Sequence, residues 1–373
     1  MSDSTRPEVE AWNGLVDALR TAGDKLASDT AGLSPLEQAD GYRALIRGLS
    51  NQLSRFDVDR ERPELVSFNG WRHKFLMDNP DFRYWVADVR SDRSYRIRGN
   101  RGDAVYVSIT AYRRTGGISS GGISSESTAR IDSDTIVFDD DGSFEILVGG
   151  DAGMDRGADH LDLPEKSSVI WVRFFHDDVS HGEAGRCSIE PLADPPTPPP
   201  LDPTKFCTQL GTLGTMTSML PTIFEVSTED DRNPPNTMRH WSEMSGGAVF
   251  TEPGIHYLRG GWQLEPGQAL VIEGDVVDCR YWNILAYSRF LNSLDFRYRP
   301  VSYTGGTATV TDGRYRFVVA AENPHPENPG SADWIDTEGR EFGIVVMRFL
   351  QPVDTPTLPS ARVVGLDELR DPR

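Results

Sequence analysis

The sequence predicts a mainly β fold made of two related antiparallel β-sandwich units, jelly-roll-like in outline, with a helical extension at the N-terminus. Three observations lead to this prediction: a composition rich in turn residues, short β-like runs on both sides of a proline-rich segment, and an internal repeat. The chain has 373 residues, of which 35 are Gly and 25 are Pro, and 38% are hydrophobic. Such a composition is typical of a turn-rich β protein, and the length allows two domains of ordinary size.

The N-terminal part of the chain carries the period of amphipathic helices. Apolar residues recur at helical spacing over residues 12–26 and again over residues 36–53. Ser34, Pro35 and Glu37 form a capping box with Pro at the first helical position, which marks the start of the second helix. We expect these helices to pack against the β units or to mediate homo-oligomerisation.

Short β-like runs begin near residue 82 and are separated by Gly, Asp and Asn. The stretch ADPPTPPP at 193–200 is a stiff polyproline segment with few donors for a sheet. A segment of mixed character, 206–224, follows it, and β-like runs resume near residue 247. The sequence therefore predicts four regions: a helical extension (1–60), a first β-sandwich unit (61–190), a Pro-rich linker (191–204) and a second β-sandwich unit (205–373).

An internal repeat relates the two units. Tyr106, Ile109, Ala111 and Tyr112 recur as Tyr281, Ile284, Ala286 and Tyr287, and Arg173-Phe174 recurs as Arg348-Phe349, all with an offset of 175 residues. Gly99 corresponds more loosely to Gly274, and the turn Asp141-Gly142 resembles Asp312-Gly313 at an offset of 171. Repetition with a nearly constant offset indicates a duplicated structural unit.

The end of the second unit resembles a known family. The likeness is carried by DGRYRF at 312–317, DWI at 333–335 and IVVMRF at 344–349. These stretches look like an uncharacterised bacterial family, catalogued as domain of unknown function 1214, over roughly residues 240 to 360. The resemblance implies a jelly-roll-like β-sandwich that closes with an Arg-bearing strand. Asp333-Trp334 stands where the family has an Asn-Trp pair, and the family brings no settled activity, so no catalytic residue is transferred.

The charge of the chain excludes several classes of partner. With 57 Asp and Glu against 38 Lys and Arg, the formal net charge is −19, which disfavours nucleic acid and anionic membranes. The first residues lack the basic and apolar regions of a signal peptide, no stretch is long enough to span a membrane, and the three cysteines lack CxxC spacing. We therefore expect a soluble cytoplasmic protein.

Motifs of catalysis and metal binding are weak. GISSG at 117–121 fits the G-x-S-x-G pattern of serine hydrolases, but it lies in a Gly/Ser repeat with no helix after it, which favours a hairpin loop or a flap. His176 with His181, and His240 with His256, are residue types that bind metals, but no ligand spacing repeats among them. We predict no metal and no cofactor, and the catalytic residues stay unknown.

The last strand of each unit carries an arginine among apolar residues, Arg173 and Arg348. A buried guanidinium needs a partner, which is either an internal carboxylate or the carboxylate, sulfate or enolate of a ligand. We favour a substrate-binding site at Arg348, closed by Asp333, Trp334, Tyr281 and Asn283. Tyr281 and Asn283 share one face of their strand, and this Tyr-rich face is either solvent-exposed or lines a cleft.

These observations leave three functions open. The first is a protein that acts on, or binds, a small and largely apolar organic molecule with an anionic or polar group in bacterial small-molecule metabolism, and the sequence does not decide whether it is an enzyme. The second is a non-catalytic β-sandwich binding module. The third is a structural protein that forms homo-oligomers through its N-terminal helices.

Overall fold

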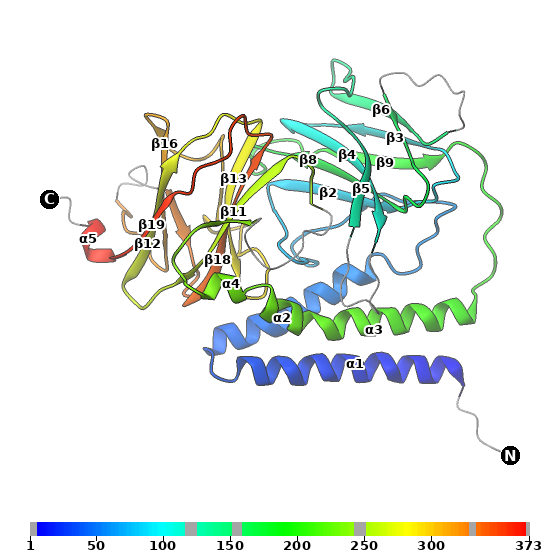
Figure 1. Cartoon of the computed structure of the whole chain (residues 1–373). Helices are drawn as coiled ribbons and strands as arrows, with labels where there is room; N and C mark the ends of the chain where they lie inside the picture. Colours follow the sequence, from blue (N-terminus) through cyan, green and yellow to red (C-terminus); the bar gives the residue numbers. More distant parts are fainter. Residues whose placement is uncertain (1–5, 116–124, 151–158, 242–250, 328–332, 371–373) are drawn as a thin grey trace.

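The computed structural model describes residues 6–115, 125–150, 159–241, 251–327 and 333–370. A layer of helices lies beneath two β-rich units, and the two ends of the chain lie at opposite ends of the molecule (Figure 1). Within the described residues, no helix combines the length and the apolar character needed to cross a membrane.

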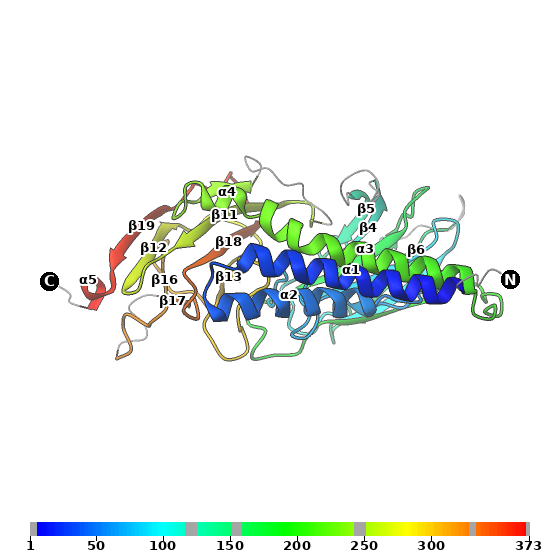
Figure 2. The same cartoon turned by 90° about the horizontal axis from the view of Figure 1, so that it is seen from below.

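Three long helices form the layer. They are α1 (Pro7–Thr30), α2 (Pro35–Leu53) and α3 (Pro203–Val226), and they run side by side in Figure 2. The predicted cap of α2 is present, because the Ser34 side chain accepts a hydrogen bond of 3.3 Å from the backbone N–H of Glu37. α3 contains the segment of mixed character that follows the Pro-rich linker, so the linker returns the chain to the N-terminal helices.

The first β unit consists of two sheets that pack face to face. One sheet has the strand order β1 (Val66–Ser67), β2 (Phe82–Asp88), β8 (Val169–Phe175), β4 (Tyr106–Arg114) and β5 (Ser125–Asp132). The other has the order β7 (His160–Leu161), β6 (Ser143–Val148), β3 (Tyr95–Asn100) and β9 (Arg186–Pro191).

The second β unit repeats this arrangement. One sheet has the order β10 (Arg239–His240), β11 (Ile255–Gln263), β18 (Phe342–Leu350), β13 (Tyr281–Ser288) and β14 (Ser302–Thr304). The other has β15 (Val310–Thr311), β16 (Arg314–Ala320), β12 (Gln268–Asp275) and β19 (Ser360–Gly365), and β17 (Asp333–Asp336) also pairs with β16. Two short helices, α4 (Glu229–Arg232) and α5 (Leu366–Arg370), complete the chain.

The two units have the same topology. Both five-stranded sheets place the last long strand, β8 or β18, in the centre, flanked by equivalent strands on each side. Each unit also contains one parallel pair, β6 with β7 and β16 with β17, in otherwise antiparallel sheets. The structure thus confirms two related units, as the internal repeat predicts.

One glycine of the repeat is required by close packing. Gly99 pairs with Phe144, and Gly274 pairs with Tyr315, at equivalent positions of the two units. A Cβ atom at either glycine would collide with the aromatic side chain that lies over it. The same local packing therefore requires the absence of a side chain in both units.

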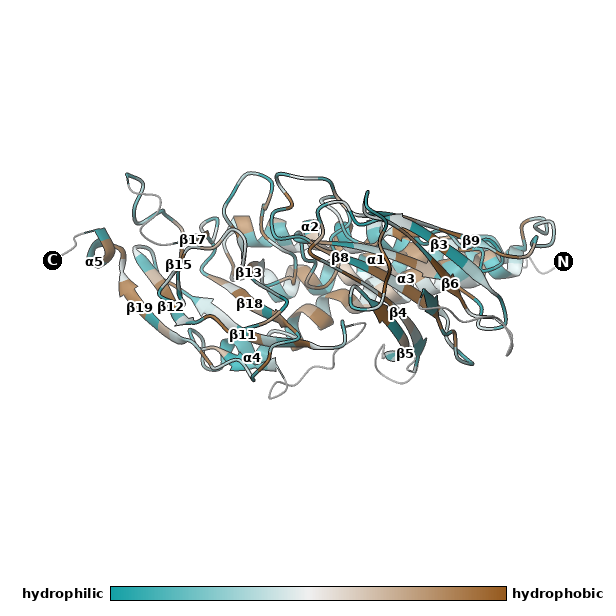
Figure 3. Cartoon of the chain, turned by 90° about the horizontal axis from the view of Figure 1, so that it is seen from above, coloured by the Kyte–Doolittle hydropathy of each residue, from teal (hydrophilic) through white to brown (hydrophobic). Residues whose placement is uncertain are grey.

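Each sandwich has an apolar interior. In the first unit it includes Ile97, Ile109 and Phe174, and in the second Trp282 and Phe317. Figure 3 shows the hydrophobic character of strands such as β4 and β18, in contrast to the hydrophilic helix α4.

The outer faces of the two central sheets are also buried. Phe82, Tyr106 and Phe175 of the first unit form one apolar cluster with Tyr281 and Leu350 of the second. The Tyr-rich faces are therefore not solvent-exposed, and the duplication brings two polar and aromatic surfaces together between the units.

Candidate functional site

The central strands place two arginines at equivalent positions between the units. On β8, Arg173 is flanked by Tyr84 and Ser108 of the neighbouring strands. On β18, Arg348 is flanked in the same way by Tyr257 and Asn283. Together with three nearby tyrosines these residues form a group that we call the Arg348 cluster. Its members are Arg348, Tyr281, Asn283, Tyr84, Tyr257 and Tyr287.

A tyrosine lies beside each arginine as well. The Arg348 Nη2 donates a hydrogen bond of 2.7 Å to the hydroxyl of Tyr287, which in turn donates to the Met77 carbonyl at 3.3 Å. The Arg173 guanidinium lies 5.6 Å from the ring centre of Tyr112, the repeat equivalent of Tyr287. The duplicated sequence thus builds the same arginine–tyrosine pair twice.

Each unit contributes one carboxylate that accepts hydrogen bonds from the other unit. Glu252, which precedes β11, accepts hydrogen bonds from Arg173 Nη1 at 2.9 Å and Ser108 Oγ at 2.7 Å. Asp81, which precedes β2, accepts a hydrogen bond from Asn283 Nδ2 at 2.8 Å and one from Ser302 Oγ. Ser108 and Asn283 are equivalent in the repeat, so the acids are exchanged symmetrically between the units.

The two arginines differ in whether they have a carboxylate partner. Arg173 has its carboxylate partner in Glu252, whereas Arg348 forms no ion pair with any residue in the described part of the chain. Asp81 is committed to Asn283 and Ser302 and makes no hydrogen bond to Arg348. The sequence left open whether each arginine pairs with an internal carboxylate or with an anionic group of a ligand. Arg173 pairs with an internal carboxylate.

Three buried polar atoms of β13 and β18 lack a hydrogen-bond partner among the described residues. They are Nη1 of Arg348, the hydroxyl of Tyr281 and Oδ1 of Asn283. The three residues are only 4%, 3% and 0% exposed. Nδ2 of the neighbouring Asn79, whose Oδ1 accepts from Asn283 at 3.2 Å, also lacks a partner in this part of the chain. Leaving such groups unpaired costs about 1–3 kcal/mol each, and more for a charged group, so their concentration at one place needs an explanation.

The tyrosines of the cluster remain protonated at neutral pH. Burial raises the pKa of Tyr84, Tyr257 and Tyr287 above the ordinary value, although the nearby Arg348 opposes this rise in each case. Their hydroxyls are therefore neutral hydrogen-bond donors beside a permanent cation. Phe82, Phe175 and Leu350 supply apolar surface next to them, and this combination suits an anionic group attached to an apolar body.

The structure brings three of the five predicted site residues together and separates the other two. Arg348, Tyr281 and Asn283 share one face of neighbouring strands. Asp333 and Trp334 lie on β17, in the opposite sheet of the sandwich.

Asp333 and Trp334 have local structural roles. The Asp333 carboxylate accepts hydrogen bonds from the backbone and hydroxyl of Thr309, at 2.6 and 2.9 Å, and Trp334 Nε1 donates to the Ala320 carbonyl at 3.0 Å. They do not close the Arg348 site, because the chain crosses between the two sheets in the short segment before β18. Nearness in sequence to β18 is therefore misleading here.

Sequence reasoning missed the residues from other strands. Tyr84 and Tyr257 occupy equivalent register positions, opposite Arg173 and Arg348, and the repeat, extended upstream, would have paired them. The acids Asp81 and Glu252 each lie just before the first long strand of a unit, but their exchange between units leaves no signal in the sequence.

The histidines are dispersed. His176 is buried, and its Nε2 accepts a hydrogen bond of 3.4 Å from the Gly185 N–H, while the exposed His181 contacts Asp178. His240 and His256 contact each other through ring nitrogens 2.9 Å apart. Over the described ranges, no three His, Cys, Asp or Glu side chains are grouped to hold a metal. The GISSG motif at 117–121 lies outside the described residues.

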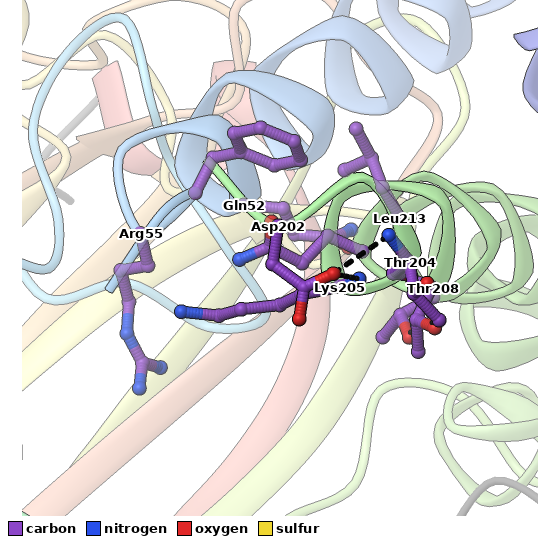
Figure 4. Close-up of a pocket in the computed structure, with 10 residues that line it drawn as sticks. Gln52, Arg55, Asp202, Thr204, Lys205, Thr208 and Leu213 are labelled. Carbon is purple, nitrogen blue, oxygen red and sulfur yellow. Dashed lines mark hydrogen bonds between the residues drawn. The ribbon is translucent and has the colours of Figure 1, made fainter. Parts of the chain in front are cut away.

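A separate pocket of about 450 Å³ lies between the end of α2 and the start of α3 (Figure 4). Asp202 on its wall caps α3 by accepting hydrogen bonds from the backbone N–H groups of Thr204 and Lys205. Arg55, also in the wall, is paired with Asp88. Asp202 and Arg55 are engaged in this way, whereas the Lys205 side chain has no ion pair among the described residues.

Comparison with known proteins supports the fold and offers no function. Residues 261–354 match the family model described as protein of unknown function (DUF1214). The crystal structure of an uncharacterised protein from Burkholderia cenocepacia is similar with a TM-score of 0.85 and 27% sequence identity, over 96% of this chain and 97% of that chain. No curated protein matches the chain.

A more distant structure has the same general fold. The VPA0106 protein from Vibrio parahaemolyticus matches with a TM-score of 0.50 and 10% identity, over 93% of this chain and 100% of that chain. The resemblance seen in the sequence is confirmed: the second unit of this chain carries the pattern of the family of unknown function DUF1214, within a two-unit fold that is also found in the Burkholderia cenocepacia protein.

Proposed function

We propose that the protein binds a small, largely apolar organic molecule between its two β units, and that the anionic group of this molecule pairs with Arg348. The observation that carries the proposal is the set of three unpartnered buried atoms, Arg348 Nη1, Tyr281 Oη and Asn283 Oδ1. A carboxylate would accept from Arg348 and Tyr281, and a donor group on the ligand would satisfy Asn283.

The comparison with Arg173 supports this assignment. The two arginines occupy equivalent positions, but a protein carboxylate already occupies the place beside Arg173. The Arg173–Glu252 pair thus shows that a carboxylate can be the partner of a guanidinium in this environment of the sheet. The ligand's carboxylate would take at Arg348 the role that Glu252 takes at Arg173.

The proposal is binding, and turnover is a separate question. Tyr84 and Tyr257 are protonated donors near Arg348 and could stabilise negative charge that develops on a bound molecule, whereas the hydroxyl of Tyr287 already donates to Met77. The three cysteines are free thiols, which favours a cytoplasmic location for this activity.

Calorimetric titration with benzoate tests the proposal, because benzoate combines a carboxylate with an apolar ring. The wild-type protein should bind benzoate, and its neutral isostere benzamide at least tenfold more weakly. Arg348→Lys keeps the charge but loses the planar fork, so its affinity for benzoate should fall at least tenfold.

Two further variants make the result decisive. Arg173→Lys changes the equivalent but internally paired arginine, and its folded form should keep the affinity for benzoate. Tyr281→Phe removes an unpartnered hydroxyl without removing the ring, and it should weaken binding in a fully folded protein. Equal affinity for benzoate in the wild type, Arg348→Lys and Tyr281→Phe would refute the proposed site.

A further inference from the structure

A second group of cations surrounds a single indole, at a distance in sequence from the strands of the Arg348 cluster. Arg43 and Arg47 of α2, Lys74 of the β1–β2 connection, and Arg297 lie 5.0, 4.3, 4.4 and 3.3 Å from the ring centre of Trp71. We call this group the Trp71 cluster. Cation–π contacts orient these side chains, but they do not balance their charge.

Three of the four cations have protein partners. Lys74 is fully buried and donates to the carbonyl and hydroxyl of Ser293 at 2.6 and 2.8 Å. Arg297 pairs with Asp295 at 3.2 Å, and Arg43 lies 3.8 Å from Asp40. These contacts account for the positions of the Lys74, Arg297 and Arg43 side chains.

Arg47 is the exception. It is only 7% exposed, and it makes no hydrogen bond and no ion pair with any residue that the structure describes. Burial, followed by the charge of Arg43, lowers the pKa of Arg47 to about 10. The guanidinium of Arg47 therefore keeps hydrogen-bond donors free for an anion that the described residues do not supply.

The acids near Arg47 are engaged elsewhere. Asp78 accepts hydrogen bonds from the backbone and hydroxyl of Ser293 at 2.9 and 2.6 Å. Asp40 accepts a hydrogen bond of 3.0 Å from Arg340. Asp295 pairs with Arg297. Counted together, four cations (Arg43, Arg47, Lys74 and Arg297) face these three acids, one of which, Asp40, is shared with Arg340, so the cluster keeps a net positive charge.

Three side chains of the cluster reach solvent. Those of Arg43 and Arg297 are 44% and 36% exposed, and Trp71 is partly exposed. All three guanidinium carbons lie within 5.0 Å of the same ring centre, so an anion at the edge of the indole is within reach of arginines from two separate segments. Arginine forks match the oxygens of phosphate groups, and three of them suit a multiply charged oxyanion better than a single carboxylate.

We propose that Arg47, Arg43 and Arg297 form a binding site for a phosphate-type oxyanion beside Trp71. Its residues differ from those of the Arg348 cluster, so the two proposals stand or fall separately. Free phosphate and the phosphate group of an organic ester share this chemistry.

Calorimetric titration of the full chain in a phosphate-free buffer tests the site, with inorganic phosphate and phenyl phosphate as probes. We expect saturable binding by the wild type and at least a tenfold loss of affinity in Arg47→Gln. The two probes are compared in the Arg348→Lys background, because phenyl phosphate is also an anionic group on an apolar ring and the Arg348 cluster could bind it. There, tighter binding of phenyl phosphate would identify an ester as the preferred form, and tighter binding of inorganic phosphate would identify the free ion.

Three control variants complete the test. Arg20→Gln removes an exposed charge from α1 and should keep the phosphate affinity. Arg297→Gln changes an exposed member of the site, so it tests the proposal independently of any folding defect in Arg47→Gln, and it should also weaken binding. Arg348→Lys should leave phosphate binding unchanged. No saturable binding to the wild type, or equal affinity in Arg47→Gln and Arg297→Gln, would overturn the proposal.

Discussion

At the scale of single residues, the two equivalent arginines differ through the acids that face them. Glu252 is long enough to contact Ser108 and still reach Arg173. Asp81, shorter by one methylene, contacts Asn283 but forms no ion pair with Arg348 within the described chain. The two acids also stand at different positions, three residues before Tyr84 and five residues before Tyr257, and only Glu252 reaches its arginine.

Two tyrosines of one strand should respond oppositely to loss of the hydroxyl. Tyr281→Phe removes a hydroxyl that has no partner among the described residues, so the free energy of unfolding should stay constant or rise. Tyr287→Phe removes the acceptor of Arg348, so it should lower that free energy by about 1.5–3 kcal/mol. Urea unfolding of both variants without ligand checks this, and equal losses would contradict the description of the cluster.

His176 should make the fold sensitive to mild acid. Burial, then the charge of Arg83, lowers its pKa in the folded state to about 4, against 6.5 as the ordinary value. Between pH 6.5 and 4 the unfolded chain binds the additional proton, so stability should fall as the pH falls through this window, by roughly 3 kcal/mol in all.

The variant His176→Gln isolates this effect from the carboxylates that titrate nearby. Its amide oxygen can accept the hydrogen bond of Gly185, and it carries no titrating group. Urea unfolding at pH 7, 5.5 and 4.5 should show a shallower loss of stability for the variant than for the wild type. Parallel pH profiles would contradict the buried neutral state of His176.

At the scale of elements, the sequence predicted α1 and α2 but not α3. The capping box at Ser34 and the apolar period marked the first two helices. In α3, several Thr and Gly residues and the internal Pro221 obscure the helical pattern. Tertiary packing decides in favour of the helix, because Gly214 allows α3 to approach Ala18 and Leu15 of α1 closely.

Two glycines of α3 should therefore respond differently to alanine. A Cβ atom at Gly211 would meet nothing within 4 Å, so Gly211→Ala should raise the free energy of unfolding by up to about 1 kcal/mol. A Cβ atom at Gly214 would lie 3.1 Å from the Ala18 Cβ, so Gly214→Ala should be less stable than Gly211→Ala. Thermal unfolding of the pair measures this, and equal melting temperatures would argue against the close packing of α1 and α3.

At the scale of the whole molecule, the repeat predicted the architecture because the same residues recur in both units and form the same strands in the same order. Alternation along β13 and β18 also placed Tyr281, Asn283 and Arg348 on one face. The sequence could not show that the outer faces of the two central sheets meet, since that contact joins residues more than a hundred positions apart. Asp333 and Trp334 were misplaced for a different reason: they stand shortly before β18 in the sequence but belong to the opposite sheet.

The central claim is that an anionic organic molecule binds at Arg348 between the two units. The most direct measurement is a crystal structure of the full chain with 4-bromobenzoate, in which the anomalous signal of bromine locates the ligand. The account predicts the carboxylate within hydrogen-bond distance of Arg348 Nη1, with the ring and its bromine against Phe82, Phe175 and Leu350. Density for the ligand only elsewhere, at Trp71 or in the pocket between α2 and α3, with Arg348 left without it, would contradict the claim.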